Sequence, residues 1–154
     1  MQNPDVQSID SIIKAMYETI SGPAGQPRQW DRDRALHHPD ARLIPTRPIG
    51  GAGGPEAQVM DFDGFVASRT PYFETNDFYE IEIARQEFRF GSIAHVLSAY
   101  EARKSPEGEL LRRGINSLQL FYDGTRWWII SCLWDNEREE NPLPDLSSRG
   151  AQTR

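Results

Sequence analysis

Residues 117–131, "SLQLFYDGTRWWIIS", decide the fold because they form two alternating strands around a tight turn. Asp123-Gly124 between alternating segments is the strongest short signal of a β-hairpin. A two-residue turn at this dipeptide predicts four cross-strand pairs: Tyr122 with Thr125, Leu120 with Trp127, Leu118 with Ile129, and Asn116 with Ser131. The open alternative is a three-residue loop, which would exchange the two faces of the last strand.

The preceding strand, "SIAHVLSAYEARK" at residues 92–104, adds a second hairpin through the turn "SPEGE". This hairpin predicts that Ser98 pairs with Asn116 and that Glu101 pairs with Arg113. Opposite charges directly across two strands favour that register. Ser98, Asn116 and Ser131 then form one row of small polar side chains on a face that is otherwise apolar.

This polar row predicts a ligand cavity on the inner face of the sheet. A buried polar group without a partner costs roughly 1–3 kcal/mol, so the row must bond to itself, to water or to a ligand. Mutual hydrogen bonding beneath a helix is the equally weighted alternative. The predicted ligand-contacting residues are Ser98, Asn116, Ser131, Val96, Leu118 and Trp127.

The outer face of the same strands mixes charged side chains with large aromatic ones. Such a surface is typical of a sheet half-buried by a second subunit. We therefore expect a homodimer joined through this face. The residues expected at the interface are His95, Gln119, Trp128 and Trp134.

The rest of the chain predicts helices first and an antiparallel meander afterwards. Apolar residues at helical spacing indicate helices at residues 5–22, 30–38 and 61–76. An edge strand is expected at 41–47, a glycine-rich linker or lid at 48–58, and long strands from residue 78 onward. This order indicates an α+β fold with three helices packed on a curved, mainly antiparallel sheet. We expect a single domain at 1–140 and an irregular tail at 141–154.

Composition excludes several classes of protein. The 154 residues carry a formal charge of −6 and no basic patch, which argues against partners such as nucleic acid or an anionic membrane. A single cysteine, Cys132, excludes an internal disulfide and favours a reducing compartment. The first ten residues lack the features of a signal peptide, and no apolar run is long enough to span a membrane. A cytoplasmic location is therefore expected.

The stretches "WDRDRALHHPDARLIPT", "SIAHVLSAYEAR" and "RGINSLQLFYDGTRWWIISCLWDNE" together resemble the nuclear transport factor 2-like superfamily, in particular its small SnoaL-like bacterial domains. The resemblance covers roughly residues 9–142. It implies a cone of helices against a bent sheet, with a pocket at the open end. That fold hosts isomerases, dehydratases, epoxide hydrolases, cyclases and non-catalytic modules, so the fold alone does not assign a reaction. The catalytic carboxylates of the dehydratase-like members have no counterpart in "GQPRQW".

The sequence predicts a small-molecule binding domain or a cofactor-independent enzyme of unknown specificity, and the alternative is a non-catalytic structural or partner-binding dimeric domain. For an enzyme, the candidates for proton-transfer chemistry on a small hydrophobic or cyclic metabolite are Asp135, Tyr100 and Glu80. Asp135, at the mouth of the predicted cavity, is the preferred general base, with Tyr100 and Asn116 as donors to a developing oxyanion. The equally weighted alternative is an aspartate in a turn at the end of the strand. Glu80 and Glu82 share one face of the strand 78–90. That pattern favours a solvent-exposed polar face, and the alternative is a carboxylate of raised pKa facing the cone. The histidine spacing, including His37 and His38 at a predicted helix end, indicates no metal site.

Overall fold

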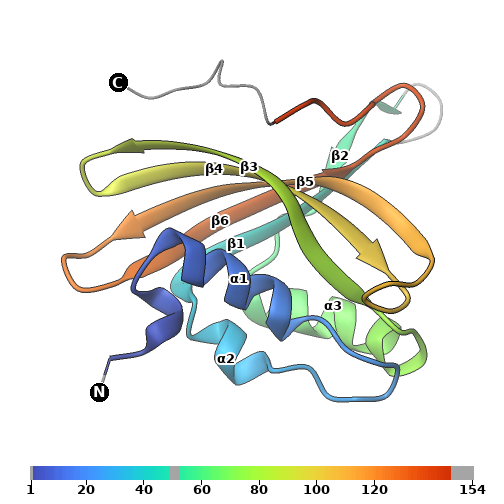
Figure 1. Cartoon of the computed structure of the whole chain (residues 1–154), viewed down its shortest axis with the longest axis horizontal. Coiled ribbons are helices and arrows are strands. Elements are labelled where there is room, and N and C mark those ends of the chain that lie inside the picture. The colour runs from blue at the N-terminus through green and yellow to red at the C-terminus, as the bar shows by residue number, and fades with distance from the viewer. Residues whose placement is uncertain (1, 49–52, 147–154) are drawn as a thin grey trace.

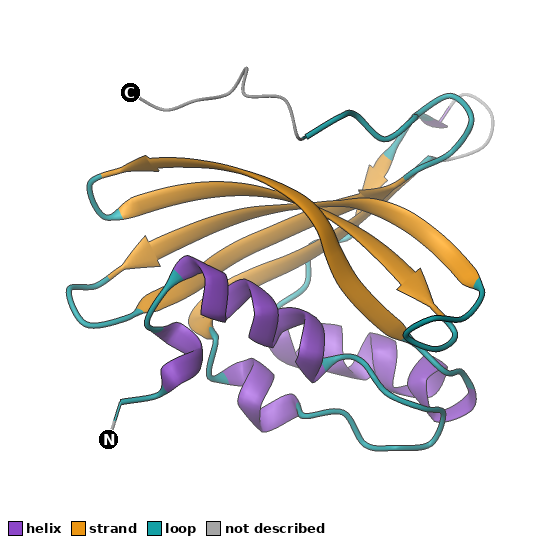
Figure 2. Cartoon of the chain, viewed as in Figure 1, coloured by secondary structure: helices purple, strands orange, loops and turns teal. Residues whose placement is uncertain are grey.

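The protein is described by a computed structural model over residues 2–48 and 53–146. Three helices lie together on one side of a strongly curved six-stranded sheet (Figures 1 and 2). The helices are α1 (Ile9–Thr19), α2 (Trp30–Arg34) and α3 (Phe62–Thr75), and a 3₁₀ turn, η1 (Pro4–Val6), precedes them. The strands are β1 (His37–Arg47), β2 (Glu56–Ala57), β3 (Tyr79–Phe90), β4 (Ile93–Arg103), β5 (Leu110–Tyr122) and β6 (Trp127–Asn136). The predicted α+β fold is confirmed.

Helix α1 forms where the apolar spacing predicted it. Ser8 caps the helix by accepting a hydrogen bond from the amide of Ser11, and the Ser11 hydroxyl oxygen accepts one from the amide of Ser8. The apolar stripe of the helix is buried against the sheet and forms the main core together with residues of β4, β5 and β6. Its buried residues include Ile9, Ile12, Ile13, Met16 and Tyr17.

The second predicted helix is wrong in its length. Helix α2 ends at Arg34, and His37 and His38 already belong to β1, which continues through Pro39. The strand forms early because Ile129 of β6 donates its amide hydrogen to the carbonyl of Leu36. His37 is therefore not a residue of a helix end. It starts a strand that runs parallel to β6.

The sheet order is β2-β1-β6-β5-β4-β3. Strand β1, predicted to lie at an edge, pairs with β2 only at Thr46 and Arg47. Strands β1 and β6 are parallel, and the other neighbouring strands of the sheet are antiparallel. The predicted pairing of β4 with β5 is confirmed at Ser98 with Asn116 and at Glu101 with Arg113. His95 also pairs with Gln119.

The predicted pairing of β5 with β6 is wrong because the loop is longer than two residues. Among the described residues, no residue other than glycine has a positive φ, so Asp123 does not adopt the conformation that the predicted turn requires. Instead its carboxylate accepts hydrogen bonds from the amides of Thr125 and Arg126. Tyr122 consequently pairs with Trp127 across residues 123–126.

A β-bulge then exchanges the faces of the second half of β6. Leu120 pairs with Ile129 and Gln119 with Ser131, so Ile130 is the extra residue. Trp127 and Ile129 face the core, and so do Cys132 and Trp134 beyond the bulge. Two predictions are therefore wrong: Ser131 does not join the row of Ser98 and Asn116, and Trp134 does not lie on the outer face. Cys132 takes the place beside Asn116.

The chain after β6 is irregular as far as it is described. Arg138 and Asn141 form an isolated bridge, and Leu146 is buried. The division into a domain at 1–140 and a tail at 141–154 remains a prediction, since residues 147–154 lie outside the described part. The centre of the predicted linker or lid, residues 49–52, lies outside it as well. None of the described helices is both long and apolar enough to cross a membrane.

Candidate functional site

A cavity of about 420 Å³ lies between the helices and the inner face of the sheet. Exposed Arg47 and Arg112 are among its lining residues, so the cavity reaches the surface. Its aromatic walls are Phe65, Tyr72, Phe73, Phe78 and Trp134. The ionisable residues at its wall include Asp33, His37, Arg69, Glu80, Tyr100 and Arg112. A largely aromatic pocket with a few polar groups is the usual form of a small-molecule site.

Glu80 is the carboxylate that β3 directs into this cavity. Ile81 and Ile83, its neighbours on the other face of the strand, are exposed, so the expected solvent-facing role of Glu80 and Glu82 is wrong. Burial raises the pKa of Glu80 to about 7. The amide of Asn116 and the positive charges of Arg112 and Arg69 oppose that rise. At neutral pH, Glu80 thus exists as both acid and carboxylate.

Asn116 is held at the cavity wall by three neighbours. Its side-chain nitrogen Nδ2 donates to the hydroxyl oxygen of Tyr17 at 3.0 Å and to Oε1 of Glu80 at 3.5 Å. The thiol of Cys132 donates to Oδ1 of Asn116 at 3.7 Å, which fixes the orientation of the amide. Asn116 therefore presents a donor, not an acceptor, to Glu80.

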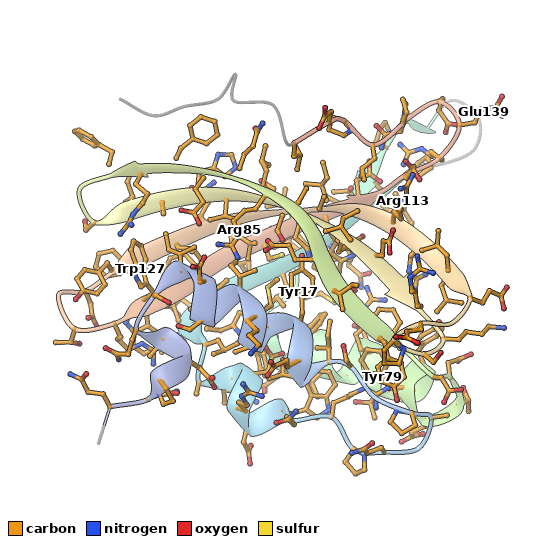
Figure 3. All side chains as sticks on the ribbon, in the orientation of Figure 1. Tyr17, Tyr79, Arg85, Arg113, Trp127 and Glu139 are labelled. Atoms are coloured by element: carbon orange, nitrogen blue, oxygen red, sulfur yellow. The ribbon has the colours of Figure 1, made fainter. Side chains whose placement is uncertain are left out.

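The same network continues from Tyr17 of α1 through Ser98 and Glu82 to Arg85; Figure 3 labels Tyr17 and Arg85. The Tyr17 hydroxyl lies 2.7 Å from Ser98 Oγ, and Ser98 donates to Glu82. Glu82 in turn pairs with Arg85 at 2.8 Å. Since Ser98 uses its proton on Glu82, the Tyr17 hydroxyl donates to Ser98. Ser98 and Asn116 are thus satisfied within the protein, as the mutual-bonding alternative expects.

Asp33 and His37 form a buried pair on another wall of the cavity. His37 Nδ1 lies 2.8 Å from the backbone carbonyl oxygen of Asp33 and 3.7 Å from its carboxylate oxygen Oδ1. A carbonyl only accepts, so Nδ1 carries a proton, and when the ring is neutral its Nε2 keeps a free lone pair. Nε2 is buried without a hydrogen-bond partner among the described residues. Burial raises the pKa of Asp33, while His37 opposes the rise.

Some of the predicted site residues line the cavity, and the others do not. Glu80, Tyr100 and Asn116 line the cavity. Val96, Leu118 and Trp127 belong to the solid core beneath α1, and Ser98 lies behind Tyr17. The bulge places Ser131 and Asp135 away from the cavity, and Asp135 pairs with Arg138 at 2.9 Å.

Tyr100 keeps its proton because burial raises the pKa of its phenol, with the charge of Glu80 as the next contribution. Its hydroxyl donates to Oδ1 of Asn136 at 2.7 Å. Among the described residues, no group of three or more histidine, cysteine, aspartate or glutamate side chains could hold a metal ion.

Four residues of the cavity were missed from the sequence: Asp33, His37, Arg69 and Arg112. One signal for the first two was present, because a spacing of four puts Asp33 and His37 on one face of the predicted second helix. Arg69 lies on α3 between Phe65 and Phe73, which are two residues of its buried face. An arginine inside such a stripe is a signal for a charge at a cavity wall. Arg112 carried none.

Comparison with known proteins identifies the fold. No family model matches the chain, and no curated protein matches its sequence significantly. A protein of unknown function with a cystatin-like fold from Nostoc punctiforme aligns with a TM-score of 0.65 at 8% identity, over 85% of this chain and 90% of that chain. LinA aligns with a TM-score of 0.61 at 10% identity, over 89% and 88% of the two chains.

A nuclear transport factor 2-like protein of unknown function from Silicibacter pomeroyi aligns with a TM-score of 0.52 at 14% identity, over 84% of this chain and 92% of that chain. The chain therefore has the nuclear transport factor 2-like fold, as the sequence resemblance indicated. At these identities the likeness is one of fold, and function must be argued from the cavity. The narrower resemblance to SnoaL-like domains remains a prediction.

Proposed function

We propose that the protein is a cofactor-independent enzyme that moves a proton within a small, largely apolar cyclic or aromatic substrate, as isomerases and dehydratases do. The observation that carries this proposal is Glu80, a carboxylate of near-neutral pKa in a mostly aromatic cavity of about 420 Å³. A general base works best when its pKa lies near the operating pH. Glu80 meets that condition, whereas the initially preferred Asp135 does not reach the cavity.

In this reaction, Glu80 takes a proton from a carbon next to a carbonyl group of the substrate. The electron pair of the broken C–H bond moves to the carbonyl oxygen as an enolate. Tyr100, still protonated, exchanges its hydrogen bond to Asn136 for one to this oxyanion. Asn116 orients Glu80 by donating to Oε1.

When the substrate has a C=C bond between its β and γ carbons, the enolate is conjugated and the proton returns to the γ carbon. The C=C bond moves next to the carbonyl group, which completes an isomerisation without net oxidation. Glu80 supplies that proton when the new site is on its own side of the substrate. His37 is the second proton-accepting group of the cavity, because its buried Nε2 carries a free lone pair. An elimination needs a base to remove the proton and an acid to protonate the leaving group. With Nε2 of His37 as the base, the protonated form of Glu80 is that acid.

The test is hydrogen exchange in heavy water. The protein is incubated in D₂O with a panel of cyclic ketones and enones, and mass spectrometry measures deuterium incorporation next to the carbonyl. We expect Glu80→Gln to reduce exchange of an active substrate about 10²–10⁴-fold, the usual contribution of a general base. Glu87→Gln is the matched control, since Glu87 lies on the same strand but does not line the cavity. Equal rates in both variants would overturn the assignment.

A second proposal concerns assembly, and specific observations favour it. The outer face exposes several large apolar side chains: Ile81, Ile83, Phe90, Ile93 and Leu133. We propose a homodimer through this face, with His95, Gln119 and Trp128 at its border. Sedimentation velocity should give the mass of two chains for the wild type and of one chain for Ile83→Glu. A wild type that sediments as a single chain at high concentration would exclude this dimer.

A further inference from the structure

We infer that the substrate is a monocarboxylic acid with an apolar body, and that its carboxylate binds between Arg69 and Arg112. The inference rests on the proposed function where it calls the ligand a substrate, and it adds the chemical class of that ligand. The binding site itself is argued from the cavity alone.

Two unpaired arginines in one cavity carry the argument. Among the described residues, the arginines that form neither a hydrogen bond nor an ion pair with the described part of the chain are Arg69, Arg89 and Arg112. Arg69 and Arg112 both line the cavity, and Arg89 does not. A guanidinium carries five N–H donors, and leaving those of half-buried Arg69 without an acceptor is unfavourable. Exposed Arg112 adds a second positive charge where the cavity reaches the surface.

Aromatic rings hold both guanidinium groups in place. The guanidinium carbon of Arg69 lies 5.6 Å from the ring centre of Trp134, and that of Arg112 lies 5.7 Å from the ring centre of Phe78. Contacts of this kind use the flat face of the group and leave its N–H edge available. A carboxylate matches that edge with two parallel hydrogen bonds.

The charges of the cavity select a monoanion. Arg69 and Arg112 contribute two positive charges, and Glu80, when ionised, contributes one negative charge. The other ionisable groups at the wall add no net charge: Arg47 pairs with Glu56 at 3.1 Å, and burial raises the pKa of Asp33, which favours its uncharged form. One positive charge is therefore left for the ligand. Burial and repulsion from Arg112 both lower the pKa of Arg69, and a bound anion relieves the repulsion.

The position of this charge also suits the proposed chemistry. Both arginines act electrostatically on Glu80, so a carboxylate between them lies near the proposed base. The remaining walls are the aromatic rings of α3, Phe78 and Trp134, which suit an apolar ring. A volume of about 420 Å³ accommodates an acid the size of phenylacetate with room for substituents.

The experiment is isothermal titration calorimetry of the full chain with phenylacetate, phenylacetamide and phenyl phosphate. We expect phenylacetate to bind at least about tenfold more tightly than its uncharged amide, because hydrogen bonds to charged groups are the stronger ones. Arg69→Gln and Arg112→Gln should each weaken phenylacetate binding about tenfold or more. Arg89→Gln is the matched control, since Arg89 also lies over an aromatic ring, that of Trp127, but outside the cavity. Circular dichroism and thermal unfolding verify that each variant is folded.

Each outcome decides the inference. Equal affinity for acid and amide, unchanged affinity in both cavity variants, or no binding of phenylacetate at millimolar concentration would overturn it. Tighter binding of phenyl phosphate than of phenylacetate would show that the site prefers a phosphate ester to a carboxylate, and would overturn the proposed class. Glu80→Gln removes a negative charge and should bind phenylacetate as tightly as the wild type or more so. Intact binding without any proton exchange would leave the inference standing and remove the proposed function.

Discussion

At the scale of single residues, the cavity wall is a set of opposing influences on Glu80. Burial disfavours its charged form, and Asn116, Arg112 and Arg69 favour it. Tyr17, Tyr100 and Cys132 stay protonated because burial raises the pKa of each of them. Glu80 is thus the group in this network that titrates near neutrality.

The raised pKa predicts how stability depends on pH. The folded protein keeps the Glu80 proton up to about pH 7, whereas an unfolded glutamate loses it near 4.5. Stability from Glu80 is therefore complete below pH 4.5 and declines as pH rises to about 7. Relative to Glu80→Gln, the wild type should lose on the order of 2–3 kcal/mol across that interval. Urea unfolding of both proteins at several pH values measures this difference, and parallel curves would contradict it.

Tyr17 is the residue that satisfies the polar pair Ser98 and Asn116. Tyr17→Phe removes its hydroxyl and leaves both partners with one hydrogen bond fewer in the buried interior. We expect a loss of about 1–3 kcal/mol in the free energy of unfolding. Tyr122→Phe is the matched control, because the Tyr122 hydroxyl bonds only to the exposed carbonyl of Gly124 among the described residues. Equal effects of the two substitutions would show that the buried network is not stabilising.

At the scale of elements, the bulge in β6 determines what reaches the cavity. It turns Cys132 and Trp134 inward, next to Asn116 and Phe65. If Ile130 were not an extra residue in β6, the side chains of Ser131, Leu133 and Asp135 would face the helices instead. The hairpin itself is evident from the alternation around Asp123-Gly124. The loop length and the bulge are not, because they depend on hydrogen bonds of the Asp123 side chain and on packing against α3.

Gly114 of β5 tests the contact between neighbouring strands at the cavity. It pairs with Tyr100 of β4, and the Tyr100 ring lies directly over it. A Cβ atom at Gly114 would stand 2.4 Å from the Tyr100 hydroxyl oxygen and 2.4 Å from the carbonyl oxygen of Asp135. We expect Gly114→Ala to lower the free energy of unfolding by about 1–3 kcal/mol, as overpacking does. A change within about 0.5 kcal/mol, typical of surface positions, would refute this packing.

At the scale of the whole molecule, the cavity lies between α3 and the half of the sheet that α1 does not fill. Helix α1 fills the other half of the sheet, which is why Val96, Leu118 and Trp127 became core residues. The α+β order and the inner face of β4 and β5 could be predicted from periodicity. The partnership of His37, Arg69, Glu80 and Arg112 could not, because these residues come from four separate elements. Their proximity is a property of the curved sheet and not of any local pattern.

The measurement that tests the account most directly is the ionisation of Glu80 itself. Carbon-13 labelling of the glutamate side-chain carboxyls and an NMR titration from pH 3 to 9 report each group, and Glu80→Gln identifies the resonance. The account predicts one carboxyl with a pKa of about 7 that is missing from the variant. A Glu80 resonance that titrates at the ordinary glutamate pKa of about 4.3 would contradict the account and remove the proposed base.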